Sequence, residues 1–427
     1  MSSTFSVSRF ALAGICVAAC AESAPGPEEI GQGALVEDLY DQLPNNTLLA
    51  NEHGFAATFS DAGFVDLDNA FFTPQGTNGR HCGTCHAPEA GWTLTGAIAT
   101  ELFLRTDGLH PLFANHLDTD TPTADMSTTE ARWKATTMLR QGKFARKAAP
   151  PATRDFDVVA VDDPFEVSTT SLLFWFRRPL PTANLRSFNV LWDSQLTTGA
   201  DLVEGLKKQA RGAVINLLGG PPAPEAVIAE ITTYERQLSH AQIYLDGVGR
   251  LDAGGARGGP AYAAQQPLIA GRFDLYDAWR SSPYEKQRQI WRGQEVFNNV
   301  NAPSGRRCGG CHTAANNGQN VEGALFDIGA SRPDVARSDM AVFTIQSRAT
   351  GATIRTTDPG QAIRTGQLAH MNLFKVPNLR GLASRAPYFH NGIAENLEKV
   401  VKHYKDALGF DFTSNERDDL IAFLKAL

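Results

Sequence analysis

Two short units, each with two cysteines and a histidine at fixed spacing, constrain this chain more than any other feature. The first is HCGTCH at 81–86 and the second is RCGGCH at 307–312. They contain four of the six cysteines, at Cys82, Cys85, Cys308 and Cys311. With six cysteines and ten histidines among 427 residues, composition alone would produce fewer than one C-x-x-C-H unit. The fold must therefore bring two thiols and an imidazole together at two places.

The spacing of both units is that of a covalent haem attachment site. In C-x-x-C-H, the two thiols add to the vinyl groups of a c-type haem and the adjacent histidine ligates the iron. The sequence thus predicts two covalently bound haem c groups, with His86 and His312 as iron ligands. A four-cysteine zinc site would leave both histidines idle, a thioredoxin-type pair would need a βαβ unit, and two small disulfides would explain neither histidine. These three remain the alternatives.

The N-terminal segment predicts export. Arg9 ends a short polar region, and Phe10–Ala19 form an apolar run that is too short to span a bilayer. The run ends in VAAC, which resembles a bacterial lipoprotein box with Cys20 as the lipidated residue; the alternative is a secretory signal cleaved near Ala19 or Ala24. We expect 1–33 to be a signal peptide and flexible tether. The mature protein would then be periplasmic, with a lipid anchor in the lipoprotein case.

The composition is that of an ordinary globular protein, with 42% hydrophobic and 20% charged residues. The net charge is −7 and the basic residues are scattered, which excludes nucleic acid as a partner. No second apolar run of about 20 residues follows the first. The length allows two domains with substantial cores.

The surroundings of the two units predict two related modules. A segment with apolar residues at helical spacing, 291–297, precedes the second unit, and a helix is expected from about Glu225 to Gln237. Strand-like alternation is sparse, so the expected fold class is mainly α, with two cytochrome c-like haem domains and long loops. We place the N-terminal haem domain at 34–260 and the C-terminal one at 261–427. The last helix could pack back on the N-terminal domain.

Two helices are expected at the C-terminal end. In 396–410, Leu397, Val400, Val401, Tyr404 and Leu408 follow the spacing of one helix face. Tyr404 therefore points with the apolar residues, while His403 is rotated about 100° away. The last helix begins at Thr413, where TSNE is a capping-box pattern.

Four blocks of the chain resemble the bacterial di-haem cytochrome c peroxidases and their MauG-type relatives. They are the two haem units, RRPLPTANLRSFNVLWDS at 177–194, KQA at 208–210, and FKVPNLRGLASRAPYFHNG at 374–392. The resemblance spans roughly 50–427. It implies that His86 and His312 are the proximal ligands of two haems, the first reactive and the second a relay.

The resemblance also implies a second axial ligand fourteen residues after His390. The peroxidases have a methionine there, whereas this chain has Tyr404, as MauG-type relatives do. A phenolate favours ferric iron, so the potential of this haem should be low. The alternatives are a core tyrosine with His403 or Met371 as ligand, or an open site.

Further site residues follow from the same resemblance. Trp192 matches a tryptophan that relays electrons between the haems, with a plain core tryptophan as the alternative, and Lys375 matches a basic residue near the propionates or the relay. Gln209 matches the glutamine that lies ten residues before a distal glutamate. In this chain that count reaches Gly219, and Glu225 lies six residues further on. The arginine of the family's W-D-G-R is replaced by Gln195.

These features favour a haem oxidoreductase of the cytochrome c peroxidase type, in which the N-terminal haem activates peroxide or oxygen. The alternative is a non-catalytic electron carrier with both irons six-coordinate, its N-terminal site closed by one of four histidines: His53, His110, His116 or His370. A haem-based sensor has no feature that favours it.

The resemblance also bears on partners. It implies a small electron-donor protein, such as a cytochrome or a cupredoxin, and a homodimer. It further implies a calcium ion between the domains, on backbone carbonyls that here would be those of Arg385 and Pro387.

Overall fold

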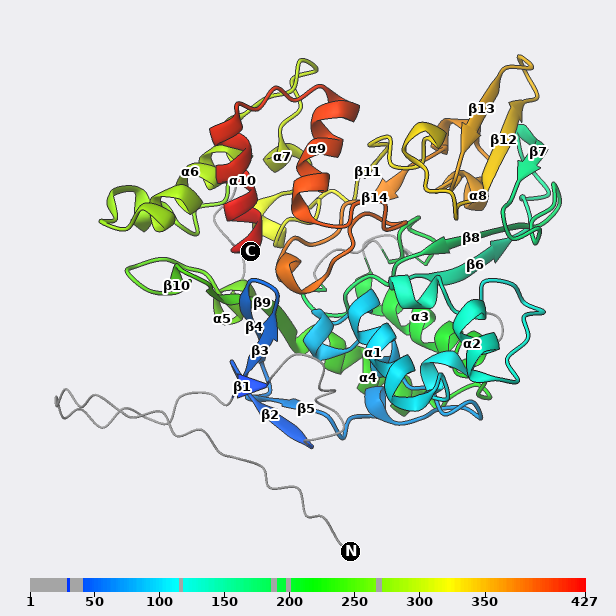
Figure 1. Cartoon of the computed structure of the whole chain (residues 1–427), viewed down its shortest axis with the longest axis horizontal. Coiled ribbons are helices and arrows are strands. Elements are labelled where there is room, and N and C mark those ends of the chain that lie inside the picture. The colour runs from blue at the N-terminus through cyan, green and yellow to red at the C-terminus, as the bar shows by residue number, and fades with distance from the viewer. Residues whose placement is uncertain (1–28, 31–40, 115–117, 186–189, 197–200, 266–270) are drawn as a thin grey trace, which may run out of the picture.

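The computed structural model describes residues 29–30, 41–114, 118–185, 190–196, 201–265 and 271–427 (Figure 1). The expected signal peptide and tether at 1–33 lie outside the described residues except for Glu29 and Ile30, and so does His116. None of the helices described has the length and apolar character needed to cross a membrane.

The helices expected from periodicity and capping are confirmed. Helix α4 covers Glu225–Gln237, and α6, Glu285–Asn299, contains the segment expected before the second haem unit. Helix α9 covers Leu397–Leu408. Helix α10 covers Ser414–Lys425, and Thr413 and Glu416 form the expected capping box.

The core of the C-terminal half forms where α10 lies across α6 (Figure 1). The two helices approach so closely at Gly293 that a β-carbon there would lie 1.9 Å from the carbonyl oxygen of Asp419. Arg292 also donates to the Asp419 carboxylate, at 2.8 Å through Nε. The hydroxyl of Tyr276 donates to the carbonyl of Ala426 at 2.5 Å. The last helix thus packs on α6, and the expectation that it also packs back on the N-terminal domain stays a prediction.

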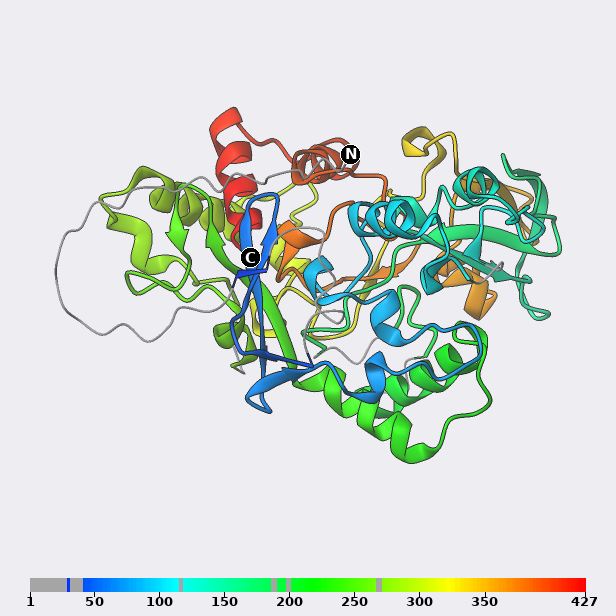
Figure 2. The ribbon, with the colours of Figure 1, turned by 60° about the horizontal axis from the view of Figure 1, so that its bottom comes forward.

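The core of the N-terminal half lies between α4 and α3, Leu202–Asn216, and the short helix η2, Ala70–Phe72. Figure 2 brings α3 and α4, in green, to the bottom of the view. Phe71 and Trp92 are fully buried in this core. Helices α1, Gly96–Thr106, and α2, Thr129–Ala135, complete this half.

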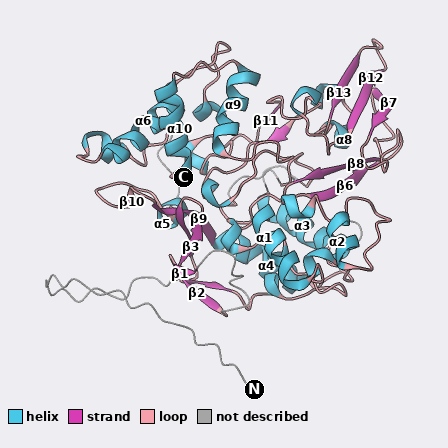
Figure 3. Ribbon diagram, in the orientation of Figure 1, coloured by secondary structure: helices cyan, strands magenta, loops and turns pink. Residues whose placement is uncertain are grey.

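The expectation of a mainly α fold is wrong, because the structure is mixed, with 35% helix and 17% strand (Figure 3). The largest sheet has the order β1-β3-β4-β9-β10 and the next the order β13-β12-β7. The strands of the first sheet are, in that order, β1, Glu29–Ile30, β3, Leu48–Asn51, β4, Gly54–Ser60, β9, Leu238–Leu245, and β10, Gly249–Arg250. Those of the second are β13, Thr353–Thr356, β12, Val342–Ser347, and β7, Phe156–Asp162. Three pairs complete the set: β2, Gln42–Pro44, with β5, Phe64–Asp66; β6, Phe144–Ala148, with β8, Leu173–Arg177; and β11, Leu325–Phe326, with β14, Phe374–Lys375.

The sequence pattern concealed these strands for a physical reason. Strand β9 is buried along nearly its whole length and follows α4 directly, so it lacks the period-two alternation of a half-exposed strand. Its partner β4 lies about 180 residues earlier in the chain, as the pairing of Thr58 with His240 shows. Local periodicity cannot reveal a pairing between segments so far apart.

The two halves share a sheet. Strand β7 belongs to the N-terminal half, yet it pairs with β12 of the C-terminal half from Phe156–Ser347 to Asp162–Val342. The core cluster beneath this sheet also draws on both halves, including Trp175 and Ile363. The domain division at 260 stays a prediction, and the halves are joined at more than one place.

Candidate functional site

The first C-x-x-C-H unit forms a short helical turn, η3, Cys82–Thr84, and its histidine is half-buried. The Nδ1–H of His86 donates to the carbonyl of Trp92 at 3.1 Å. A carbonyl bond to Nδ1 fixes the tautomer and leaves Nε2 with the lone pair that a metal needs.

The second unit repeats this arrangement. Helix α7, Cys308–Cys311, ends at His312, whose Nδ1–H donates to the carbonyl of Gly318 at 2.8 Å. In both units the accepting carbonyl lies six residues after the histidine. Burial lowers the pKa of His86 and of His312 to about 4, so both imidazoles are neutral at neutral pH, as iron ligands must be.

The four cysteines of the units are free thiols. Burial raises the pKa of Cys85 to about 11 and that of Cys308 to about 12, so these groups are protonated at neutral pH. Across the described residues, no group of three or more His, Cys, Asp or Glu could hold a metal ion. The zinc and disulfide alternatives therefore find no support in this structure.

The second unit opens into an apolar cavity of about 180 Å³. Cys308, Cys311 and His312 lie on its wall together with Tyr404 and Trp192. The attachment residues and the apolar lining fit a haem group.

Tyr404 lies where the helix face predicted, with its ring against the cavity. Burial and the nearby Cys308 and Cys311 raise its pKa. The two alternative ligands do not line this cavity: His403 donates from Nε2 to the carbonyl of Ile328 at 2.8 Å, and Met371 packs in the core under the β7–β12 sheet. The role of Tyr404 as ligand stays a prediction.

Trp192 and Lys375 line the cavity, and so do Thr93 and Leu180 of the N-terminal half. The indole N–H of Trp192 donates to the carbonyl of Arg178 at 2.8 Å, and the Lys375 backbone N–H donates to the carbonyl of Trp192 at 2.8 Å. Burial lowers the pKa of Lys375 to about 8. Their relay and propionate roles stay predictions.

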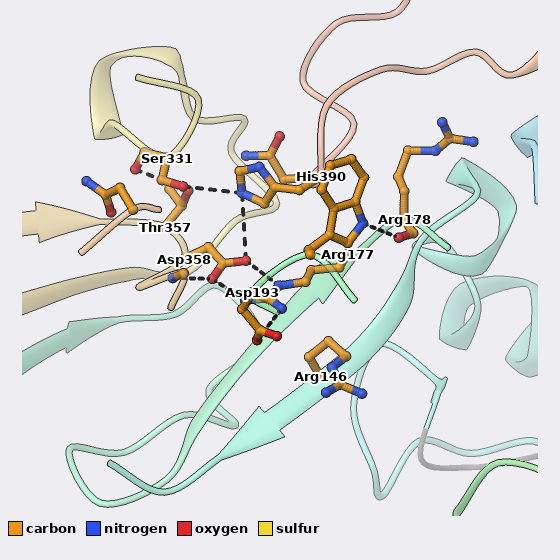
Figure 4. Close-up of polar contacts among 12 residues, drawn as sticks. Arg146, Arg177, Arg178, Asp193, Ser331, Thr357, Asp358 and His390 are labelled. Carbon is orange, nitrogen blue, oxygen red and sulfur yellow. Dashed lines mark hydrogen bonds and ion pairs between the residues drawn. The ribbon is translucent and has the colours of Figure 1, made fainter. Parts of the chain in front are cut away.

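A buried ion-pair cluster supports this wall (Figure 4). Arg177 binds Asp358 at 2.6 Å and Asp193 at 2.8 Å, and all three side chains are at most 3% exposed. His390 contacts Ser331 at 3.2 Å, and burial lowers its pKa to about 4. Sequence reasoning missed this cluster, because Asp358 lies 181 residues from Arg177.

Arg146 from β6 contacts Gln195, the residue that stands where the resemblance implies an arginine. Its Nη2 donates to Oε1 of Gln195 at 3.3 Å, so a cation lies beside the glutamine that replaced one (Figure 4 labels Arg146). Gln209 is half-buried on α3, next to Ala210 in the N-terminal core. Its catalytic role stays a prediction.

The structure does not bring Gly219 or Glu225 into the role of a distal acid. Gly219 adopts a φ of +68°, and its loop packs against the segment before the first unit. Glu225 is exposed and ion-paired, at 2.7 Å to Arg211 and 3.2 Å to Lys207. In this structure the Glu225 carboxylate therefore faces Arg211 and Lys207 at the surface.

A different carboxyl group lies near the first unit. Glu235 on α4 is 3% exposed, and its Oε2 has no hydrogen-bond partner among the described residues. Burial raises its pKa to about 8, and its charge helps to raise the pKa of Cys82. The sequence could have indicated a buried carboxyl here, since Glu235 shares a helix face with Ile228 and Ile231 at i, i+3 and i+7.

The histidines considered as further ligands have other roles where they are described. His110 accepts from the backbone N–H of Leu112 at 3.2 Å and so caps a short helix. His370 is half-buried and contacts Thr365 at 3.0 Å. His53 lies half-buried at the turn between β3 and β4. No contact with His86 is seen for these three.

The expected calcium site does not fit this structure. The Arg178 guanidinium donates from Nη1 to the carbonyls of Arg385, at 2.6 Å, and Pro387, and from Nη2 to that of Leu94 at 2.7 Å. The two carbonyls expected to bind calcium therefore already face an internal cation. Sequence reasoning missed it, because Arg178 and Arg385 are 207 residues apart.

Comparisons with known proteins identify relatives by sequence. No family model matches the chain. The methylamine utilization protein MauG of Methylophilus methylotrophus is 25% identical over 179 residues, 39% of this chain and 45% of that protein. The cytochrome c551 peroxidase of Nitrosomonas europaea is 25% identical over 266 residues, 59% of this chain and 66% of that protein. The cytochrome-c peroxidase IdrP2 of Denitromonas iodatirespirans is 30% identical over 132 residues, 28% of this chain and 36% of that protein. The chain thus matches less than two thirds of each relative's length.

Solved structures with some similarity carry related names. A MauG-like protein associated with microbial copper homeostasis is 20% identical, with a TM-score of 0.36, over 59% of this chain and 73% of that chain. A variant of the diheme peroxidase BthA from Burkholderia thailandensis is 15% identical, with a TM-score of 0.33, over 84% of this chain and 83% of that chain. The relationship therefore stands on the sequence relatives.

Replacing Glu235 with Gln should flatten the pH dependence of stability. The carboxyl has a pKa of about 8 when folded, against an ordinary glutamate value of 4.5, so the native state binds more protons between these pH values and loses stability as pH rises through them. The variant lacks the free-energy cost of ionising this carboxyl in the folded protein, which is on the order of 4 kcal/mol at pH values above 8. Urea unfolding across this window measures the effect.

The exposed Glu225→Gln variant is the matched control, because its helix is the same and its carboxyl is solvated. Its stability should follow the pH dependence of the unmodified protein. An unchanged slope in the Glu235→Gln variant would contradict the burial of that charge.

Proposed function

Because its curated relatives are MauG proteins and cytochrome c peroxidases, we propose that this chain is a di-haem c-type oxidoreductase. One observation carries the proposal: two C-x-x-C-H units, each with free thiols and a neutral, half-buried histidine oriented by a backbone carbonyl. Cys82 and Cys85 would hold one haem covalently, and Cys308 and Cys311 the other. His86 and His312 would ligate the irons.

Haem bound at these units supplies iron that exchanges electrons and can bind peroxide or oxygen. In the C-terminal cavity, Tyr404 would supply a hard oxygen donor to the iron held by His312, which would keep the potential of that site low. The carbonyl of Arg178 fixes the indole of Trp192 at the cavity wall. Trp192 is thereby positioned to pass electrons toward the N-terminal half.

Near the first unit, Glu235 would hold or release a proton at Oε2, the carboxyl oxygen without a partner. Its pKa of about 8 lies close to neutral pH, where general acid–base groups work best. This group differs in position from the distal glutamate of the peroxidases. We therefore expect peroxide reduction at a low rate, or use of the oxidising equivalents on another substrate.

The setting of this reaction follows from the N-terminal segment. An exported chain with c-type haem would work in the periplasm, either free or held by a lipid on Cys20. Electrons would come from a small donor protein, a cytochrome or a cupredoxin, and a homodimer is the expected assembly.

Electron paramagnetic resonance of the ferric protein tests catalysis against simple electron transfer. We expect a high-spin signal from the N-terminal haem, because an iron with an open sixth position can bind peroxide. Two low-spin signals would instead identify an electron carrier with both irons six-coordinate. Iron analysis showing two haems per chain is the control for loading.

The Tyr404→Phe variant tests the second axial ligand. Loss of the phenolate should change the absorption spectrum of the C-terminal haem and raise its midpoint potential, because the anionic donor stabilises ferric iron. His403→Gln on the same helix is the matched control, since His403 binds the Ile328 carbonyl instead. A spectrum unaffected by Tyr404→Phe would remove Tyr404 from the coordination sphere.

Glu235→Gln also tests the proton-handling role. Peroxide-dependent oxidation of a reduced cytochrome should slow by about 10- to 100-fold, at the low end of what a positioned acid–base group contributes. Glu225→Gln should leave the rate unchanged, because Glu225 is ion-paired at the surface. Equal rates in both variants would exclude Glu235 from the reaction.

A further inference from the structure

Arg178 provides a cation at the junction of the two halves. Its side chain is 6% exposed and contacts three backbone carbonyls, those of Leu94 in the N-terminal half and of Arg385 and Pro387 in the C-terminal half. The Leu94 carbonyl follows the first haem unit, and the other two precede His390. One guanidinium thus links the segment that follows the first haem unit to the segment that precedes His390.

Converging backbone carbonyls are a typical cation site, whether for a metal ion or for a charged side chain. A guanidinium suits this task, because its planar donors can bind several acceptors at once and it stays charged when buried. Burial lowers the pKa of Arg178 to about 9, with Arg385 as a further cause. The group therefore remains positively charged at neutral pH.

The backbone of the same residue holds the electron-relay region. The N–H of Arg178 donates to the carbonyl of His390 at 2.7 Å, and its carbonyl accepts from the indole N–H of Trp192 at 2.8 Å. In Figure 4 a dashed line marks the hydrogen bond to the Arg178 carbonyl, and His390 is labelled nearby. A side chain fixed to the domain junction thus also fixes the position of Trp192.

We propose that Arg178 is a built-in cation that takes the place of a calcium ion between the two halves. The link between the halves, and the setting of Trp192 that depends on it, are then independent of free calcium. Since the cation is part of the chain, no chelator can remove it. This inference concerns the scaffold and does not depend on which reaction the haems perform.

The first test uses the purified holoprotein. We expect metal analysis to find iron without stoichiometric calcium. Treatment with EGTA, or addition of calcium chloride, should leave the thermal midpoint and the haem absorption spectrum unchanged. Bound calcium whose removal by EGTA lowers the thermal midpoint, with recovery on adding calcium but not magnesium, would overturn the proposal.

The second test removes the guanidinium. Arg178→Ala leaves three buried carbonyls without their donor, so the thermal midpoint should fall by about 5–10 °C. Arg178→Lys keeps the charge but reaches fewer carbonyls and should lose less. Tryptophan fluorescence of the reduced and oxidised protein should also change in Arg178→Ala, because the backbone carbonyl that accepts from Trp192 is no longer held in place by the guanidinium.

Arg132→Ala is the matched control. Arg132 also donates to two backbone carbonyls, of Asp107 at 2.8 Å and Met126 at 3.0 Å, but both lie in the N-terminal half. This variant should shift the midpoint by at most a few degrees and leave the fluorescence unchanged. If Arg178→Ala behaves like Arg132→Ala, the proposal is wrong. If Arg178→Ala does not fold, the chelator experiment on the unmodified protein decides.

Discussion

The arrangement of each C-x-x-C-H unit depends on one hydrogen bond, from the histidine Nδ1 to a backbone carbonyl six residues later. Two thiols and an imidazole can share one side of a helical turn only if the imidazole is held in one orientation. The carbonyl of Trp92 does this for His86, and that of Gly318 does it for His312. Because the accepting carbonyl follows in the same loop, each unit carries its own orienting group.

Much of the chain around these units could be predicted from sequence, because it depends on local patterns. The spacing of cysteines and histidines, the capping box at Thr413 and the helical periodicity around Tyr404 are all contained within a few turns of chain. The bounds of α4 agree with the expected Glu225–Gln237 for the same reason. Tyr404 lies against the cavity because it belongs to the apolar face of its helix, which packs inward.

The rest depends on contacts between distant segments, which leave no local pattern. Arg177 with Asp358, Arg178 with Arg385, and strand β4 with β9 are each formed by residues about 180 to 210 positions apart. Glu235 is the exception, since an acidic residue on an apolar helix face is visible in the sequence. Only the structure shows that this carboxyl group lies near Cys82 of the first haem unit.

The pairing of β7 with β12 has a consequence for how the protein is made. Strand β7 leaves the ribosome long before β12, and in its sheet its neighbour is β12. Until synthesis reaches Val342, the backbone groups of β7 lack the partner they have in the finished protein, and open strand edges invite aggregation. The sheet can therefore be completed only after synthesis has passed Val342. A gene divided at codon 260 would yield two fragments that each carry an unfinished sheet.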